Sequence, residues 1–189
     1  MTQEQDSSTV WKLFSGFDPQ VIQLIKLDPE KLERRFFDIC HSDGLEKGKS
    51  WAGTVGGSRN DDRPVHILGQ TITVHSTTAL DFPAALISHW EANSEKYFPD
   101  EQYRKLAEKA IKTFLVGFAM GALGVSQYEV AANTLNFVTD GGFTNNSEFM
   151  AKISDAVERA QDNGDVLFAT RIGNLINRGL EQKKGSTSS

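Results

Sequence analysis

Two histidines near a pair of aspartates are the residues of this chain that come closest to a metal-binding constellation. His66 and His75 fall on the polar face of an expected β-hairpin, on opposite strands, and Asp61 and Asp62 precede the first strand. Imidazole and carboxylate groups are accepted zinc ligands. A small enzyme or a ligand- or metal-binding protein, with its site between segment 43–63 and this hairpin and with Lys49 as a further candidate, is therefore an alternative hypothesis. Solvated histidines on an exposed sheet face are the simpler interpretation.

Cys40 and His41 are adjacent, but they do not have the geometry of a nucleophile and its base. Neighbouring residues on a helix point about 100° apart. Cys40 continues an apolar stripe with Leu32, Phe36 and Ile39, which indicates a small buried side chain. It is the only cysteine, so neither an intramolecular disulfide nor a four-cysteine zinc site can form.

The segment 44–50, GLEKGKS, approximates a phosphate-binding P-loop. The motif requires four residues between its glycines and a preceding buried strand, whereas this segment has three and follows a helical pattern. The backbone cradle for phosphate depends on that spacing. We therefore expect no nucleotide site, and the sequence predicts no catalytic residue, cofactor or metal.

A basic stripe follows the first half of a predicted helix. Glu101 and Glu108 stand four residues before two of its lysines, a spacing that favours ion pairs on a solvated face. The net charge of −5 and pI of about 5.4 make nucleic acid an unlikely partner. An anion or nucleic-acid contact along 104–112 is an alternative hypothesis. The stripe consists of Arg104, Lys105, Lys109 and Lys112.

The pattern of apolar residues predicts a mainly α fold. Residues 114–125, FLVGFAMGALGV, lack any charged side chain and continue an amphipathic pattern, so a central helix over 100–123 must be enclosed by others. Twelve apolar residues are too few to span a bilayer, which needs about 20. Gly117 and Gly121 would allow neighbouring helices to approach closely. We expect a bundle of about six to seven helices around this one.

One β-hairpin is expected over 64–76. A turn at Gly69-Gln70 would pair Ile67 with Ile72 and Val65 with Val74, placing four β-branched residues on one face. The expected organisation is a disordered tail over 1–8, a single helical domain over 9–184 and a disordered tail over 185–189. Within the domain, the Gly- and Ser-rich segment 43–63 is predicted to be a mobile loop.

An aromatic cluster near the N-terminus is the main candidate for partner binding. Large apolar side chains concentrated behind a polar tail suit an interface with another protein or a second copy of the chain. The polar first residues predict no signal peptide. We therefore expect a small cytoplasmic, non-catalytic binding protein, such as an adaptor, a chaperone-like protein or an accessory subunit, without membrane association. The cluster consists of Val10, Trp11, Leu13, Phe14 and Phe17.

Overall fold

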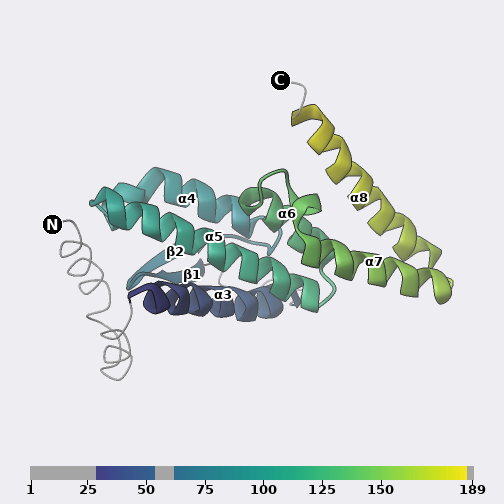
Figure 1. The fold of residues 1–189 in the computed structure, drawn as a ribbon, viewed down its shortest axis with the longest axis horizontal. Coiled ribbons are helices and arrows are strands. Elements are labelled where there is room, and N and C mark those ends of the chain that lie inside the picture. Colours follow the sequence, from purple (N-terminus) through teal and green to yellow (C-terminus); the bar gives the residue numbers. More distant parts are fainter. Residues whose placement is uncertain (1–28, 54–61, 187–189) are drawn as a thin grey trace.

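The computed structural model describes residues 29–53 and 62–186, and within these ranges it is mainly helical. In the described ranges, six α-helices, one short 3-10 helix and one antiparallel hairpin form a bundle (Figure 1), as the sequence predicts. The elements are α3 (Pro29–Gly53), β1 (Asp62–Ile67), β2 (Gln70–His75), α4 (Phe82–Tyr97), α5 (Glu101–Gly124), α6 (Tyr128–Val138), η1 (Phe143–Asn145), α7 (Ser147–Asp162) and α8 (Val166–Ser186).

The predicted central helix is confirmed in α5. Asp100 caps its N-terminus by accepting hydrogen bonds from the backbone N–H groups of Gln102, at 2.8 Å, and Tyr103, at 3.4 Å. Its second half is buried almost without interruption from Phe114 to Leu123. α3, α4, α6 and β1 all contact this helix. In the described residues, no helix is long and apolar enough to cross a membrane.

Helices α3 and α5 run parallel and touch through their backbones (Figure 1). A Cβ atom on Gly117 would overlap the carbonyl oxygen of His41, and one on Gly121 would overlap that of Leu45. The contact is reciprocal, because Cβ atoms on Gly44 and Gly48 would overlap carbonyl oxygens of α5. Each glycine instead directs a hydrogen toward a carbonyl oxygen, as in Cα–H···O contacts. Two glycine pairs of identical spacing therefore define this junction.

The prediction of a mobile loop over 43–63 is wrong for most of its length. Residues 43–53 continue α3, and residues 62–63 begin β1, while 54–61 lie outside the described residues. The P-loop-like segment is thus a stretch of helix. Its glycines weaken helix propensity by about 1 kcal/mol each, which is why the local pattern indicates a loop. They are present because α5 packs against them.

The hairpin keeps its predicted face but not its predicted pairing. Val65 pairs with Ile72 and Arg63 with Val74, so the register is shifted by two positions. A shift of two preserves which side chains share a face, and Val65, Ile67, Ile72 and Val74 are all buried as expected.

The hairpin turn lies at Leu68-Gly69 rather than at Gly69-Gln70. Both turn residues have positive φ, 50° and 76°, as a type I′ turn requires. Leucine rarely adopts this conformation. Its side chain is nevertheless buried at 7% exposure, and we attribute the register to this burial.

Side-chain caps are found at the N-termini of α7 and α8 but not at that of α6. Asn146 caps α7 by accepting a hydrogen bond from the N–H of Phe149 at 2.8 Å. Asp165 caps α8 by accepting one from the N–H of Phe168 at 3.0 Å. Helix α6 starts without a side-chain cap, after Ser126 with a φ of 61°.

Helices α7 and α8 form a hairpin that extends from one end of the bundle (Figure 1). Phe149, Ile153 and Ala156 bury the inner face of α7, and Ile172 and Leu175 bury that of α8. The N–H of Asp165 donates to the carbonyl of Ala160 at 2.8 Å, so the turn between the two helices is hydrogen-bonded. The hairpin therefore presents an ordered turn at its far end.

We expect Gly121→Ala to destabilise the protein by about 1–3 kcal/mol or more, because the new methyl group would collide with backbone atoms of α3. Chemical denaturation followed by circular dichroism measures the change. Gly173→Ala is the matched control: it lies within α8, a Cβ there meets nothing within 4 Å, and the higher helix propensity of alanine should add up to about 1 kcal/mol of stability. Equal effects at both positions would contradict the close packing of α3 and α5.

The two faces of the hairpin should respond differently to charge. Ile72→Lys should lower the melting temperature strongly, because Ile72 is fully buried and an unpaired ammonium is costly there. Thr73→Lys, on the exposed face of the same strand, should change it little. Similar melting temperatures for the two variants would show that the hairpin does not pack as described.

Candidate functional site

The two hairpin histidines are exposed but are not brought together. Nδ1 of His66 lies 3.1 Å from Oγ1 of Thr71, near the turn, and Nδ1 of His75 lies 3.4 Å from Oδ1 of Asp62, at the open end. The register places these positions four residues apart along the strand, about 13 Å. Among the described residues, no three His, Cys, Asp or Glu side chains are grouped to hold a metal ion. Asp61 lies outside those residues.

The space between α3 and the hairpin is occupied by packing around Trp51. The Trp51 ring packs edge-to-face on Phe82, with centroids 5.0 Å apart, and carries the guanidinium of Arg63 5.1 Å from its centroid. Lys47 donates to the carbonyl oxygen of Pro64 at 3.0 Å. These contacts attach β1 to α3. Lys49, the other candidate here, is exposed on α3.

Cys40 is buried, as its place in the apolar stripe predicts. Burial, with a smaller contribution from the charge of Asp43, raises the pKa of the thiol to about 12. The thiolate is the reactive form of cysteine. Cys40 is therefore a core side chain rather than a nucleophile at neutral pH.

The basic stripe on α5 is partnered along its length. Lys105 pairs with Glu101 at 2.8 Å and Lys112 with Glu108 at 2.9 Å, as the spacing predicts, and the bond from Lys105 lowers the pKa of Glu101. Lys109 lies 4.5 Å from the centroid of the Phe37 ring.

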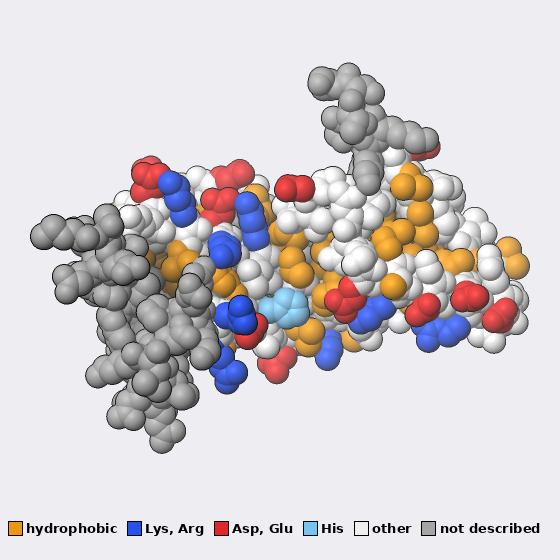
Figure 2. Space-filling model, viewed as in Figure 1, with side chains coloured by type: hydrophobic (Ala, Val, Ile, Leu, Met, Phe, Trp, Pro, Cys, Tyr) orange, Lys and Arg blue, Asp and Glu red, His pale blue; other side chains and the backbone are white. Residues whose placement is uncertain are grey.

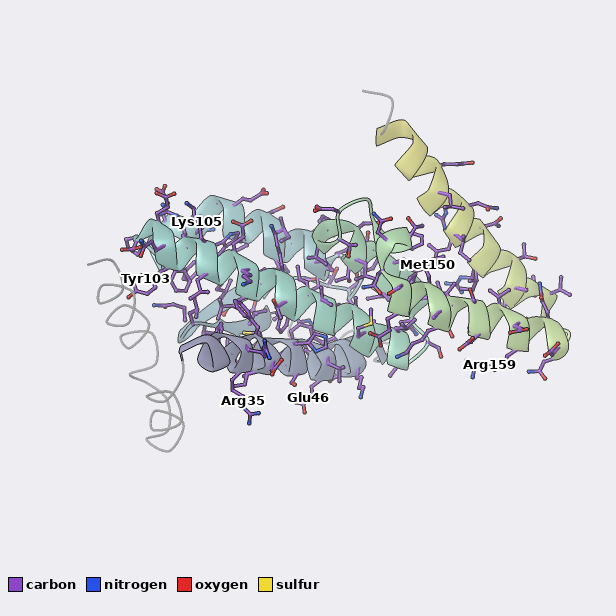
Figure 3. The ribbon with its side chains drawn as sticks, viewed as in Figure 1. Arg35, Glu46, Tyr103, Lys105, Met150 and Arg159 are labelled. Atoms are coloured by element: carbon purple, nitrogen blue, oxygen red, sulfur yellow. The ribbon has the colours of Figure 1, made fainter. Side chains whose placement is uncertain are left out.

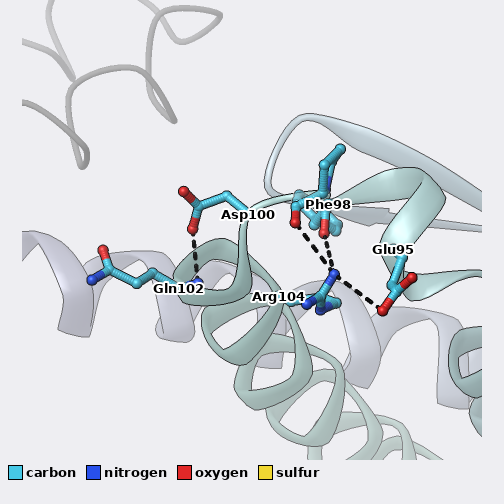
Figure 4. A network of polar contacts seen from close by, with 6 residues as sticks. Glu95, Phe98, Asp100, Gln102 and Arg104 are labelled. Atoms are coloured by element: carbon cyan, nitrogen blue, oxygen red, sulfur yellow. Dashed lines mark hydrogen bonds and ion pairs between the residues drawn. The ribbon is translucent and has the colours of Figure 1, made fainter.

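Arg104, the remaining member of the stripe, supports the α4–α5 connection (Figure 4). It donates to the carbonyl oxygens of Phe98, at 3.2 Å, and Pro99, at 3.4 Å, and lies 3.8 Å from Glu95. The geometry of the whole stripe is that of a solvated, internally paired face. It gives no specific support to the alternative of an anion or nucleic-acid contact.

The N-terminal aromatic cluster, Val10, Trp11, Leu13, Phe14 and Phe17, lies outside the described residues, so its role in partner binding stays a prediction.

A depression on the outer surface of α3 has little to offer a ligand. Arg35 and Glu46 point away from α5 there (Figure 3), and Ile39 between them is 45% exposed. Among the described residues, those that line it all come from this one helix.

A cleft of about 310 Å³ lies where α8 meets α6 and η1. Its walls come from segments far apart in the sequence: Leu80 before α4, one face of α6, Phe143 of η1, and the middle of α8. The lining residues are Leu80, Glu129, Ala132, Asn133, Asn136, Phe143, Leu175, Arg178 and Gly179. A Cβ on Gly179 would collide with the Phe143 ring, so glycine lets α8 approach η1 here.

Beside the cleft, α8 is fastened to α6 by an aromatic contact and an ion pair. The rings of Tyr128 and Phe168 meet edge-to-face at 5.5 Å. Nε of Arg171 donates to Oε1 of Glu129 at 3.0 Å. This hydrogen bond, with weaker attraction from the charges of Arg171 and Arg178, lowers the pKa of Glu129.

The far end of the α7–α8 hairpin exposes two large apolar side chains, Val166 and Leu167, called the tip below. Val166 is 72% and Leu167 86% exposed, whereas the other exposed large hydrophobic side chains of the described residues reach only 40–45%. The sequence analysis did not identify the tip. The available signal was a pair of apolar residues directly after Asp165, outside the helical stripe formed by Phe168, Ile172 and Leu175.

Comparisons of the chain with protein-family models, with curated proteins and with solved structures found no significant match. Functional inference therefore rests on the residues themselves.

We expect Arg171→Gln to raise the pKa of Glu129 toward its ordinary value, because the donor that stabilises the carboxylate is removed. Carboxyl-resonance NMR titration measures it. Since the folded-state pKa of Glu129 is depressed, the pair stabilises the protein above the unfolded-state pKa, and this contribution is lost as pH falls through the folded-state pKa. The variant should lack that component of acid sensitivity. An unchanged Glu129 titration would contradict the pair.

Proposed function

We propose that the chain is a small, non-catalytic protein-binding module, such as an adaptor or accessory subunit, that engages a partner protein through the tip. The exposure of Val166 and Leu167 carries the proposal. Neighbouring apolar side chains that are this exposed are unfavourable in water, and such surfaces mark sites where a partner binds. The cytoplasmic location expected from the sequence is part of the proposal.

The order of the turn supports this role. Asp165 both caps α8 and donates its N–H to Ala160, and Gly164 supplies the positive φ of 72° that the connection needs. The tip residues thus occupy the first turn of a capped helix. Anchors that are held in place before binding lose less entropy when they bind.

The charges around the tip indicate the chemistry of its partner. The exposed charged residues from 155 to 165 are four carboxylates and one guanidinium, and acidic side chains are visible along α7 next to the apolar end in Figure 2. A partner that complements this surface has an apolar socket bordered by lysine or arginine. The charged residues are Asp155, Glu158, Arg159, Asp162 and Asp165.

We expect Leu167→Asp to abolish stoichiometric co-purification of a protein partner with the full chain from the cells that make it, because the change places a charge in an apolar contact. The melting temperature should stay close to that of the original chain, since Leu167 is 86% exposed. Quantitative mass spectrometry of the purified complex measures the loss.

Ser154→Asp is the matched control, because it adds the same charge at an exposed position of α7, away from the tip. The control should retain the partner. Retention of every partner by Leu167→Asp, or equal loss in both variants, would exclude the tip as the binding surface.

A further inference from the structure

The cleft between α6, η1 and α8 is lined by one charged side chain, Arg178, that holds no other part of the described fold. Arg178 makes no hydrogen bond or ion pair within the described residues, although its charge contributes to lowering the pKa of Glu129. Its guanidinium offers five N–H donors in a planar fork that matches a carboxylate. A cation placed at a concave surface without a partner is a candidate for ligand recognition.

Charges at the cleft are unequal. Among the described residues that line it, Glu129 is the one carboxylate, and Arg171 donates to that carboxylate at 3.0 Å. With Arg171 committed to Glu129, the charge of Arg178 is left in excess. The cleft therefore favours an anion. Because the charge of Glu129 is balanced by Arg171, Glu129 repels that anion only weakly.

The two asparagines of the cleft are oriented by the backbone. Asn136 accepts a hydrogen bond from the N–H of Phe143 at 3.1 Å through Oδ1, which leaves its Nδ2 group to donate elsewhere. Asn133 donates from Nδ2 to the carbonyl of Leu80 at 2.8 Å, which leaves its Oδ1 as an acceptor. Asn136 from α6 and Arg178 from α8 thus both offer donors to the cleft.

The remaining walls are apolar. Phe143 and Leu175 are nearly buried beneath the cleft, and Leu80 stands at it 41% exposed. Ligand pockets typically measure about 300–1,000 Å³, so this cleft suits a small ligand. The cleft thus combines a cationic side chain and an amide donor with an adjoining apolar surface.

We propose that this cleft binds the carboxylate of a small ligand with an apolar tail. Arg178 and Asn136 hold the carboxylate by charge-assisted hydrogen bonds, and the tail lies against Phe143, Leu175 and Leu80. Two sources share this chemistry: a short fatty acid and the C-terminal residue of a peptide. The site is separate from the tip, and its test does not depend on the partner proposed there.

Titrations of the full chain followed by amide NMR test this site with matched probes. Hexanoate is compared with hexanol, and N-acetyl-Gly-Leu with its C-terminal amide. We expect each carboxylate to bind about tenfold or more tightly than its neutral counterpart, with shifts at Asn133, Asn136 and Gly179. The tighter of the two carboxylates identifies the source.

Arg178→Gln should remove the preference for the charged probe, and Asn136→Ala should weaken it. Arg159→Gln, the same change of charge at an exposed position on α7, should leave it intact. Circular dichroism confirms that each variant is folded. Equal binding of charged and neutral probes, no binding of either carboxylate, or a preference that survives Arg178→Gln would overturn the proposal.

Discussion

The direct backbone contact between α3 and α5 is the constraint on which the rest of the bundle depends. Four glycines at matching spacing remove the side chains that would otherwise hold the two helices apart. Each costs about 1 kcal/mol of helix propensity, so the packing they permit must offset that loss. With the axes this close, Phe114 and Phe118 of α5 meet Phe82, and Trp51 at the end of α3 reaches both Phe82 and Phe118. The four β-branched residues of the hairpin pack into the same hydrophobic core as this aromatic cluster.

The same contact shows where sequence reasoning succeeds and where it fails. The fully apolar stretch of α5 was sufficient to predict a central helix, because no other arrangement buries every side. Residues 43–53 were misassigned because Gly44 and Gly48 resemble loop glycines until their partner helix is known. In the hairpin, the alternation of apolar and polar residues predicts the buried face. The register differs from the prediction because Leu68 adopts a positive φ, a conformation in which its side chain is buried. Local sequence patterns thus predict which helices and strands form. Contacts between distant segments determine where these elements end and how the strands pair.

The candidate sites divide in the same way. The ion pairs of the α5 stripe follow from spacing on one helix, and Glu101–Lys105 and Glu108–Lys112 could be predicted. The tip was visible in principle, as apolar residues off the buried stripe of α8. The cleft was not, because Asn136 and Arg178 are 42 positions apart and come together only through the angle at which α8 returns past α6. No spacing in the sequence encodes that angle.

Helix α8 connects the two proposed binding surfaces, with the tip at its start and the cleft near its middle. The ion pair between Glu129 and Arg171 lies between them, but both side chains are well exposed, at 42% and 68% for Glu129 and Arg171, and such pairs contribute little stability. Burial of Ile172 and Leu175, at 2% and 9% exposure, and the close approach of Gly179 to Phe143 hold the helix instead. Because apolar packing and a glycine contact fix α8 at its middle, its first turn presents Val166 and Leu167 in one orientation. The packing that closes the apolar side of the cleft is therefore also what sets the orientation of the tip.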